Sequence, residues 1–167
     1  MRRRVSAEGT DGHGQDRGGH RESGGPGGRL GEPRAVRALL DTHILFWWLT
    51  EPDRLSPAQR RTVGGASADA PMLVSDVSLW ELATLYDLGR IHIAPPLREW
   101  LEKAVAPPLV RRQDISPAVA AELASLPDTF HRDPADRILV ATARVLGATL
   151  LTQDQRIIAS GLVETLD

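Results

Sequence analysis

The chain has 167 residues, about one domain's length, and its 41% hydrophobic and 25% charged residues are typical of a soluble globular protein. It contains no cysteine, which excludes a disulfide scaffold, a thiolate zinc site and a cysteine nucleophile. The net charge of −2 does not fit a generally basic nucleic-acid coat, and the longest apolar run, 44–49, is far shorter than a membrane span.

The first 34 residues differ in composition from the rest of the chain. They hold ten of the fifteen glycines, seven arginines, five acids and almost no large apolar side chains. Such a segment cannot bury enough apolar surface to offset its chain entropy, so we predict a disordered leader over 1–34. Glycine- and histidine-rich sequence follows Arg2, Arg3 and Arg4 where a signal peptide needs an apolar stretch. We interpret the leader as a non-native or upstream-extended start and expect one folded domain over 35–167.

From residue 35 onward, short apolar runs alternate with helical patterns. The expected strands lie at 36–40, 72–74, from 109 onward, at 148–152 and, along an edge, at 162–165. The expected helices lie at 42–49, 56–66, 76–88, 95–106, 116–125, 133–146 and 155–159. This alternation indicates βαβ units, hence an α/β fold with a parallel sheet and helices on both faces. Neither GxGxxG nor GxxxxGK[ST] is present, so a nucleotide-binding function has no support.

Acidic residues recur after the predicted strands or in the helices that follow them. They are Asp41, Glu81, Asp133, Asp136 and Asp154. Ligands of open α/β sheets bind beyond the carboxyl ends of the strands, where these acids are expected. Taken singly, the aspartates that precede helices also fit ordinary N-caps, and Asp136 in a first helical turn would favour the helix dipole.

The helix predicted over 76–88 is apolar nearly all round, which is typical of a buried helix. An ionised Glu81 would then need a partner, unless it lies on a narrow solvent stripe. We expect Trp80 and Trp100 in the core. Consecutive helical residues point about 100° apart, so the three rings of 46–48 cannot all face one core, and at least one is expected at an interface.

Several carboxylates in one cleft repel one another unless a cation neutralises them. An all-oxygen donor set without cysteine suits a hard cation, for which Mg²⁺ or Mn²⁺ is the natural choice. Such an ion can activate water and stabilise the charge on a phosphodiester under attack. The acids therefore indicate hydrolysis of a nucleic-acid backbone.

Four stretches together resemble the PIN-domain proteins, specifically the VapC-type toxin ribonucleases of type II toxin–antitoxin systems. They are 39–43 (LLDTH), 74–82 (VSDVSLWEL), 131–137 (HRDPADR) and 150–154 (LLTQD). Each is weak alone, but their order and spacing are specific. The resemblance spans about 36–167 and implies a PIN-like three-layer sandwich, with a central parallel sheet of four to five strands flanked by helices.

The resemblance implies an Mg²⁺- or Mn²⁺-dependent endoribonuclease. The family's acids fall on Asp41, Glu81, Asp136 and Asp154, with Asp133 as an additional, secondary acid. Asp41 and Asp136 would hold the principal metal, and Glu81 would share it or orient the attacking water. Asp154 would complete the set or hold a second ion.

The resemblance also implies an RNA substrate, a VapB-like antitoxin, a homodimer and a cytoplasmic location without membrane contact. Arg137 could reach a substrate phosphate or lie on the surface as an ordinary helical arginine. His43 and His131 are expected near the cleft, in supporting rather than metal-ligating roles.

Two alternatives stay open at this point. A catalytically silent PIN-like module could bind RNA or protein, although the complete acid set argues against it. A phosphatase of the haloacid dehalogenase type would need a second aspartate where this chain has His43.

Overall fold

The computed structural model describes residues 37–94 and 96–167, so the predicted leader over 1–34 lies outside the described residues. The strands are β1 Ala38–Leu40, β2 Met72–Ser75, β3 Val110–Gln113, β4 Thr149–Leu151 and β5 Thr165–Leu166. The helices are α1 Thr42–Thr50, the short 3-10 helix η1 Pro52–Arg54, α2 Pro57–Gly64, α3 Asp76–Asp87, α4 Leu97–Ala104, α5 Pro117–Ser125, α6 Pro134–Leu146 and α7 Gln155–Ser160.

Local sequence signals account for the helix boundaries. Ser56 begins α2 with a reciprocal capping box, in which its hydroxyl accepts from the Gln59 N–H and the Gln59 side chain accepts from the Ser56 N–H. Asp133 caps α6 ahead of a proline at the first helical position. Gly147 ends α6 at φ 57°, in the left-handed region that glycine adopts without strain.

All five strands pair in parallel, in the order β3-β2-β1-β4-β5. The fold prediction of a three-layer α/β sandwich is confirmed. From β1 the chain first builds outward through β2 and β3, then crosses to β4 and β5 on the other side of β1. The strand order therefore reverses between β1 and β4, the position at which open α/β sheets bind ligands.

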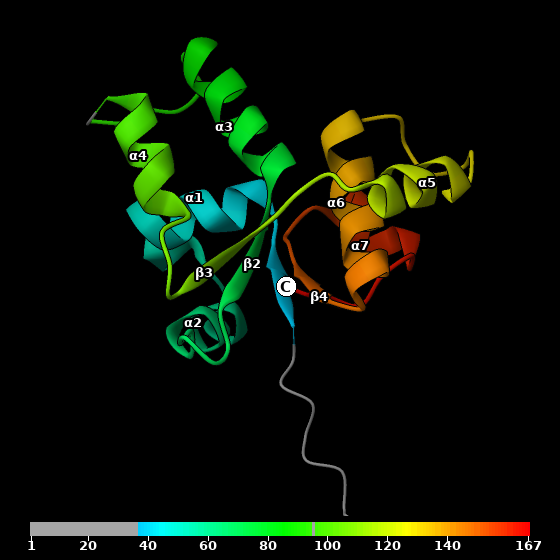
Figure 1. Ribbon diagram of the computed structural model, residues 1–167, viewed down its shortest axis with the longest axis horizontal. Helices are drawn as coiled ribbons and strands as arrows, with labels where there is room; N and C mark the ends of the chain where they lie inside the picture. The colour runs from blue at the N-terminus through cyan, green and yellow to red at the C-terminus, as the bar shows by residue number, and fades with distance from the viewer. Residues whose placement is uncertain (1–36, 95) are drawn as a thin grey trace, which may run out of the picture. The chain divides into compact units, whose positions relative to one another are not determined.

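Side chains from alternate strand positions enter two separate cores. Leu39, Leu73 and Leu150 face one layer of helices, where the buried residues come mainly from α5, α6 and α7. Leu40 and Leu151 face the other layer, formed with α1, α2 and α4. Figure 1 shows these two groups of helices on opposite sides of the strands. A sheet buried on both faces explains why its central strands read as continuous apolar runs.

The edge strand β5 begins later than predicted. The sequence favours a strand over 162–165, whereas only Thr165 and Leu166 pair with β4. Leu162 and Val163 instead pack against the first core from the segment after α7. Their apolar character reflects this packing rather than strand pairing.

The prediction that α3 is buried nearly all round is wrong. Its buried residues are Val77, Ser78 and Leu82. Trp80 within the helix is 57% exposed, and so is Leu88, the residue that follows the helix. Trp80 therefore lies outside the core, while Trp100 is half-buried against the second core. In Figure 1, α3 leaves the end of β2 and runs away from the sheet. Its last residues, Tyr86 and Asp87, are exposed, whereas Leu85 is still half-buried.

The aromatic run at the start of the domain behaves as its helical spacing predicts. Phe46 is buried, and Trp47 and Trp48 are partly exposed at the edge of the second core. Across the described ranges, the helices are all too short or too polar to cross a membrane.

Candidate active site

The acidic residues gather at the carboxyl edge of the sheet, around the point where the strand order reverses. Asp41 directly follows the central strand β1, and its main-chain N–H donates to the Leu151 carbonyl of β4 at 3.0 Å. Asp154 follows β4, Glu81 lies on α3 after β2, and Asp136 lies in the first turn of α6. Four separate chain segments therefore contribute to this site, which we call the acidic cluster (Asp41, Glu81, Asp136 and Asp154).

Asp41 is the most buried member of the acidic cluster, with 6% of its surface exposed. Its Oδ2 accepts from the Thr152 hydroxyl at 2.5 Å, and its Oδ1 accepts from the His43 main-chain N–H as the cap of α1. Burial raises the pKa of the Asp41 carboxyl, because the charged form loses its water, and the nearby charge of Asp136 raises it further. Without a counter-ion, an ionised Asp41 is unfavourable in the folded protein.

Glu81 points back from α3 toward α1. Its Oε2 accepts from the Thr42 hydroxyl at 2.7 Å. Burial raises the pKa of Glu81, and the charges of Asp41 and Asp136 add to this effect. The partner expected for Glu81 is therefore the Thr42 hydroxyl, on a helix that is buried on one face and exposed at Trp80, Tyr86 and Asp87.

Asp136 is buried at 8% exposure and has two polar partners on a single oxygen. His131 Nε2 lies 2.6 Å from its Oδ2, and the Arg156 guanidinium donates to the same atom at 3.1 Å. Burial raises the pKa of Asp136, the hydrogen bond with His131 opposes this, and the charges of Asp133 and Asp154 raise it again. The prediction that His131 lies near the cleft is confirmed.

Asp154 and Asp133 each cap a helix. The Asp154 carboxylate accepts from the Arg156 main-chain N–H at 2.7 Å and from its guanidinium at 2.6 Å. The hydrogen bond from that side chain lowers the pKa of Asp154. Asp133 accepts from the N–H groups of Ala135 and Asp136. The capping function suggested by the sequence is therefore real for both residues, and for Asp41 as well.

The donor chemistry of the acidic cluster fits a hard divalent cation. Three of its carboxyls have raised pKa values and sit within electrostatic reach of one another, so a cation would relieve their repulsion. However, within residues 37–94 and 96–167, no three aspartate, glutamate, histidine or cysteine side chains are arranged closely enough to hold a metal ion. Hydroxyl, imidazole and guanidinium groups take up the carboxylate oxygens instead.

Three residues of this site were missed by sequence reasoning. Thr42 and Thr152 hold Glu81 and Asp41, and Arg156 joins Asp136 to Asp154. Each stands one or two positions from a strand-end acid, which is the signal that could have found it. Arg137, the arginine considered for phosphate contact, instead donates to the main-chain carbonyls of Phe130 and Leu123.

We predict that Thr152→Val lowers the catalytic rate about tenfold to a hundredfold. This is the usual effect of losing a residue that orients a metal-binding side chain. The Thr152 hydroxyl donates to Asp41 and accepts from the Asp154 N–H at 3.0 Å, so valine frees two members of the acidic cluster. Thr142→Val is a matched control, because this equally buried threonine only donates within α6 to the Ile138 carbonyl. Equal losses in the two variants, measured as initial rates of the RNA cleavage that the sequence leads us to expect, would contradict the orienting role.

Comparisons with known proteins agree with this architecture. The PIN domain family matches residues 38–160. Ribonuclease VapC22 of Mycobacterium tuberculosis is 40% identical over 119 residues, which cover 71% of this chain and 88% of that protein.

Two solved structures share the fold at low sequence identity. VapBC2 from Rickettsia felis, bound to a DNA fragment from its promoter, has a TM-score of 0.60 at 13% identity and covers 78% of this chain and 98% of that one. A toxin-antitoxin complex from Klebsiella pneumoniae has a TM-score of 0.55 at 16% identity, with coverage of 78% and 96%.

Fold and site together define a three-layer parallel α/β protein with acids collected at the carboxyl edge of its sheet. The chain belongs to the PIN-domain family, in its VapC ribonuclease branch.

Proposed function

We propose that this protein is a metal-dependent endoribonuclease and the toxin of a toxin–antitoxin pair. The observation that carries the proposal is the acidic cluster at the strand-order reversal, in a chain 40% identical to a ribonuclease. The substrate is RNA, and the reaction is hydrolysis of its phosphodiester bonds. The required ion is Mg²⁺ or Mn²⁺, because the candidate ligands are carboxylate oxygens.

The proposed roles follow from burial and contacts. Asp41 and Asp136, the most buried acids, hold the principal ion, and Glu81 shares it or orients the attacking water. Asp154 completes the set or holds a second ion, with Asp133 nearby as a secondary acid. When bound, the cation neutralises the carboxylates, lowers the pKa of water and stabilises charge on the phosphate. Thr152 and Thr42 keep the carboxyls of Asp41 and Glu81 in place.

Arg156 is the better candidate for the phosphate contact first considered for Arg137. Its side chain is 60% exposed, and its guanidinium already reaches two acids of the cluster. A cation bound at Asp136 and Asp154 would compete with this guanidinium for the same oxygens. Arg156 is then free to pair with the substrate phosphate at the edge of the cluster.

The proposed partners are a VapB-like antitoxin and a second copy of this chain. A structural relative is a toxin-antitoxin complex, which supports the first partner. The exposed Trp80 on α3 and Leu88 directly after the helix offer apolar surface for the second. A toxin of this kind would act in the cytoplasm, where its RNA substrate is found.

Expression of this protein alone is expected to arrest bacterial growth, and co-expression of a small protein encoded beside it should relieve the arrest. Growth is followed by optical density after induction, and cut RNA ends are mapped in the same cultures. The Asp69→Asn protein, which changes an exposed acid in the loop before β2, should arrest growth as the unchanged protein does. Harmless accumulation of folded, metal-binding protein would contradict the toxin role and favour a silent binding module.

A further inference from the structure

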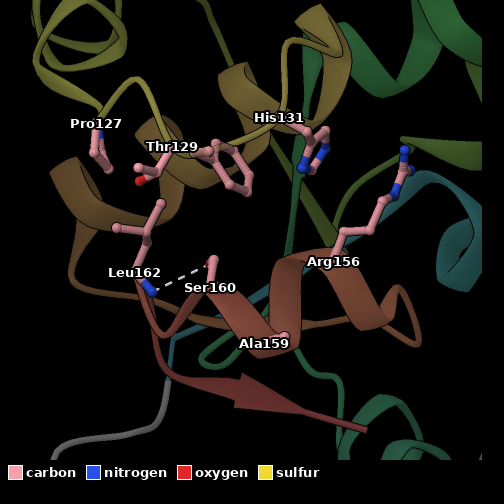
Figure 2. A pocket seen from close by; sticks show the side chains of 8 residues that line it. Pro127, Thr129, His131, Arg156, Ala159, Ser160 and Leu162 are labelled. Carbon is pink, nitrogen blue, oxygen red and sulfur yellow. Dashed lines mark hydrogen bonds between the residues drawn. The ribbon is translucent and has the colours of Figure 1, made fainter.

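A pocket of about 290 Å³ lies beside the acidic cluster, between the loop before α6 and helix α7. Figure 2 shows Thr129 and His131 descending from that loop, with Ser160 and Ala159 on α7 opposite them. His131 and Arg156 stand together at one end of the pocket. We call it the loop–helix pocket; its lining residues are Pro127, Thr129, Phe130, His131, Arg156, Ala159, Ser160 and Leu162.

The loop–helix pocket shares two residues with the acidic cluster. His131 and Arg156 line the pocket, and both contact Oδ2 of Asp136, at 2.6 and 3.1 Å. A phosphodiester held at the acids would therefore have one of its own nucleotides next to this opening. A site for part of the substrate is expected in this position because each scissile phosphate connects two nucleotides.

The walls of the loop–helix pocket have the chemistry that an unpaired base requires. Phe130 is buried in the first core and its ring centroid lies 4.3 Å from that of His131, so the aromatic surface that the pocket offers is the His131 ring, with the exposed Arg156 guanidinium beside it. Unstacked RNA bases pack on aromatic rings and on arginine planes. Thr129 is exposed and adds a hydroxyl that can bond to a base edge.

The charge of the pocket distinguishes it from the acidic cluster. Among the residues that line it, none is acidic, and Arg156 is a permanent cation. Pro127, Ala159 and Leu162 make much of the remaining wall apolar. A hard divalent cation finds no carboxylate here, whereas a flat, partly apolar group attached to a phosphate fits the wall.

We propose that the loop–helix pocket binds one unpaired base of the substrate RNA next to the scissile phosphate, and so sets a nucleotide preference at one position beside the cut. The inference rests on the proposed ribonuclease function and deepens it. It predicts that cleavage selects single-stranded or looped RNA at that position, because a paired base cannot enter the pocket.

The test fills the pocket without touching the acids. Ala159 is exposed on α7, and Ala159→Phe places a ring into the space opposite Thr129. Ala121→Phe is the matched control, because Ala121 is an exposed α5 residue that does not line the pocket. Both proteins are incubated with RNA randomised around one cut site, and the products are sequenced.

The unchanged protein and Ala121→Phe are expected to prefer one base at a single position beside the cut. Ala159→Phe should lower kcat/KM on the preferred RNA about tenfold or more, as expected when base stacking is lost, and should flatten that preference. Hydrolysis of bis(p-nitrophenyl) phosphate, a diester without a base, should be equal in all three proteins.

Results that differ from these overturn either the base pocket or the ribonuclease function. An unaltered preference and rate in Ala159→Phe would overturn the base pocket and leave the ribonuclease intact. An equal loss on the base-free diester would show damage to the acidic cluster and also overturn the pocket. A loss confined to antitoxin binding would assign the pocket to a protein partner instead. Failure of the unchanged protein on both RNA and diester would refute the proposed function itself.

Discussion

The Asp41→Asn protein is expected to lose RNA cleavage by about a thousandfold or more, the scale of about 4 kcal/mol in transition-state energy. Asp41 is the most buried acid of the cluster, and it is placed at the end of the central strand. Asparagine keeps its shape but not its charge, so the proposed cation loses a principal ligand. The measurement is the initial rate on a defined RNA in Mn²⁺, compared with the same reaction in EDTA.

The same variant is expected to unfold at a higher temperature than the unchanged protein when no metal is present. Burial raises the pKa of Asp41, so its ionised form opposes folding at neutral pH, and asparagine removes that cost. A gain of about 1 kcal/mol would raise the midpoint of unfolding by roughly 3–5 °C in a domain of this size. A gain in stability with loss of function is typical of a site built for activity.

Asp69→Asn controls both measurements. It removes an exposed acid that precedes the first residue of β2, whereas the acidic cluster lies beyond the other end of that strand. It should change neither the cleavage rate nor the midpoint of unfolding. An Asp41→Asn protein that cleaves RNA at more than a tenth of the normal rate would remove Asp41 from the proposed metal site.

Mn²⁺ is expected to stabilise the folded protein strongly, and to do so more at pH 7.5 than at pH 5. At one hundred times the dissociation constant, a ligand that binds only the folded state adds about 2.7 kcal/mol, or roughly 10 °C here. The carboxyls of Asp41, Glu81 and Asp136 must be ionised to bind, and their raised pKa values make protons effective competitors. Thermal unfolding across pH, with and without Mn²⁺, measures the effect.

The metal-free protein gives the opposite trend. A carboxyl whose folded pKa is raised contributes stability that is complete below its ordinary value and is lost as pH rises through the folded pKa. The advantage of Asp41→Asn over the unchanged protein should therefore grow from pH 4 toward neutrality. Asp154, whose pKa is lowered by Arg156, acts the other way, and its contribution is lost as pH falls. A stabilisation by Mn²⁺ that is independent of pH would contradict binding at these carboxyls.

The arrangement of the fold could be predicted because its signals are local and mutually consistent. Apolar runs of three to five residues mark the central strands, and serine, aspartate and proline mark the helix starts. Capping and site formation turned out to be compatible. Asp41 caps α1 through one oxygen and accepts from Thr152 through the other, so the N-cap alternative does not compete with a role in the acidic cluster.

The parts that sequence reasoning missed depend on long-range geometry. Arg156 reaches Asp136, twenty positions earlier in the chain, because α7 lies beside the start of α6. No local sequence pattern predicts that these two helices are neighbours. The exposure of Trp80 depends on which face of α3 packs against its neighbours, and the nearly all-round apolar pattern of this helix does not specify that face. Glu81 was correctly expected to need a partner, but Thr42 was visible only after α1 and α3 had been placed together.

The proposed nuclease function depends on a divalent ion bound between the acids at the end of β1 and the start of α6. Crystals of the protein soaked in Mn²⁺ test it most directly, through the anomalous scattering of manganese. We expect an anomalous peak within bonding distance of the Asp41 and Asp136 carboxylates, with Arg156 withdrawn from Asp136. A fully soaked crystal with no peak there, or with manganese bound only elsewhere, would contradict the claim.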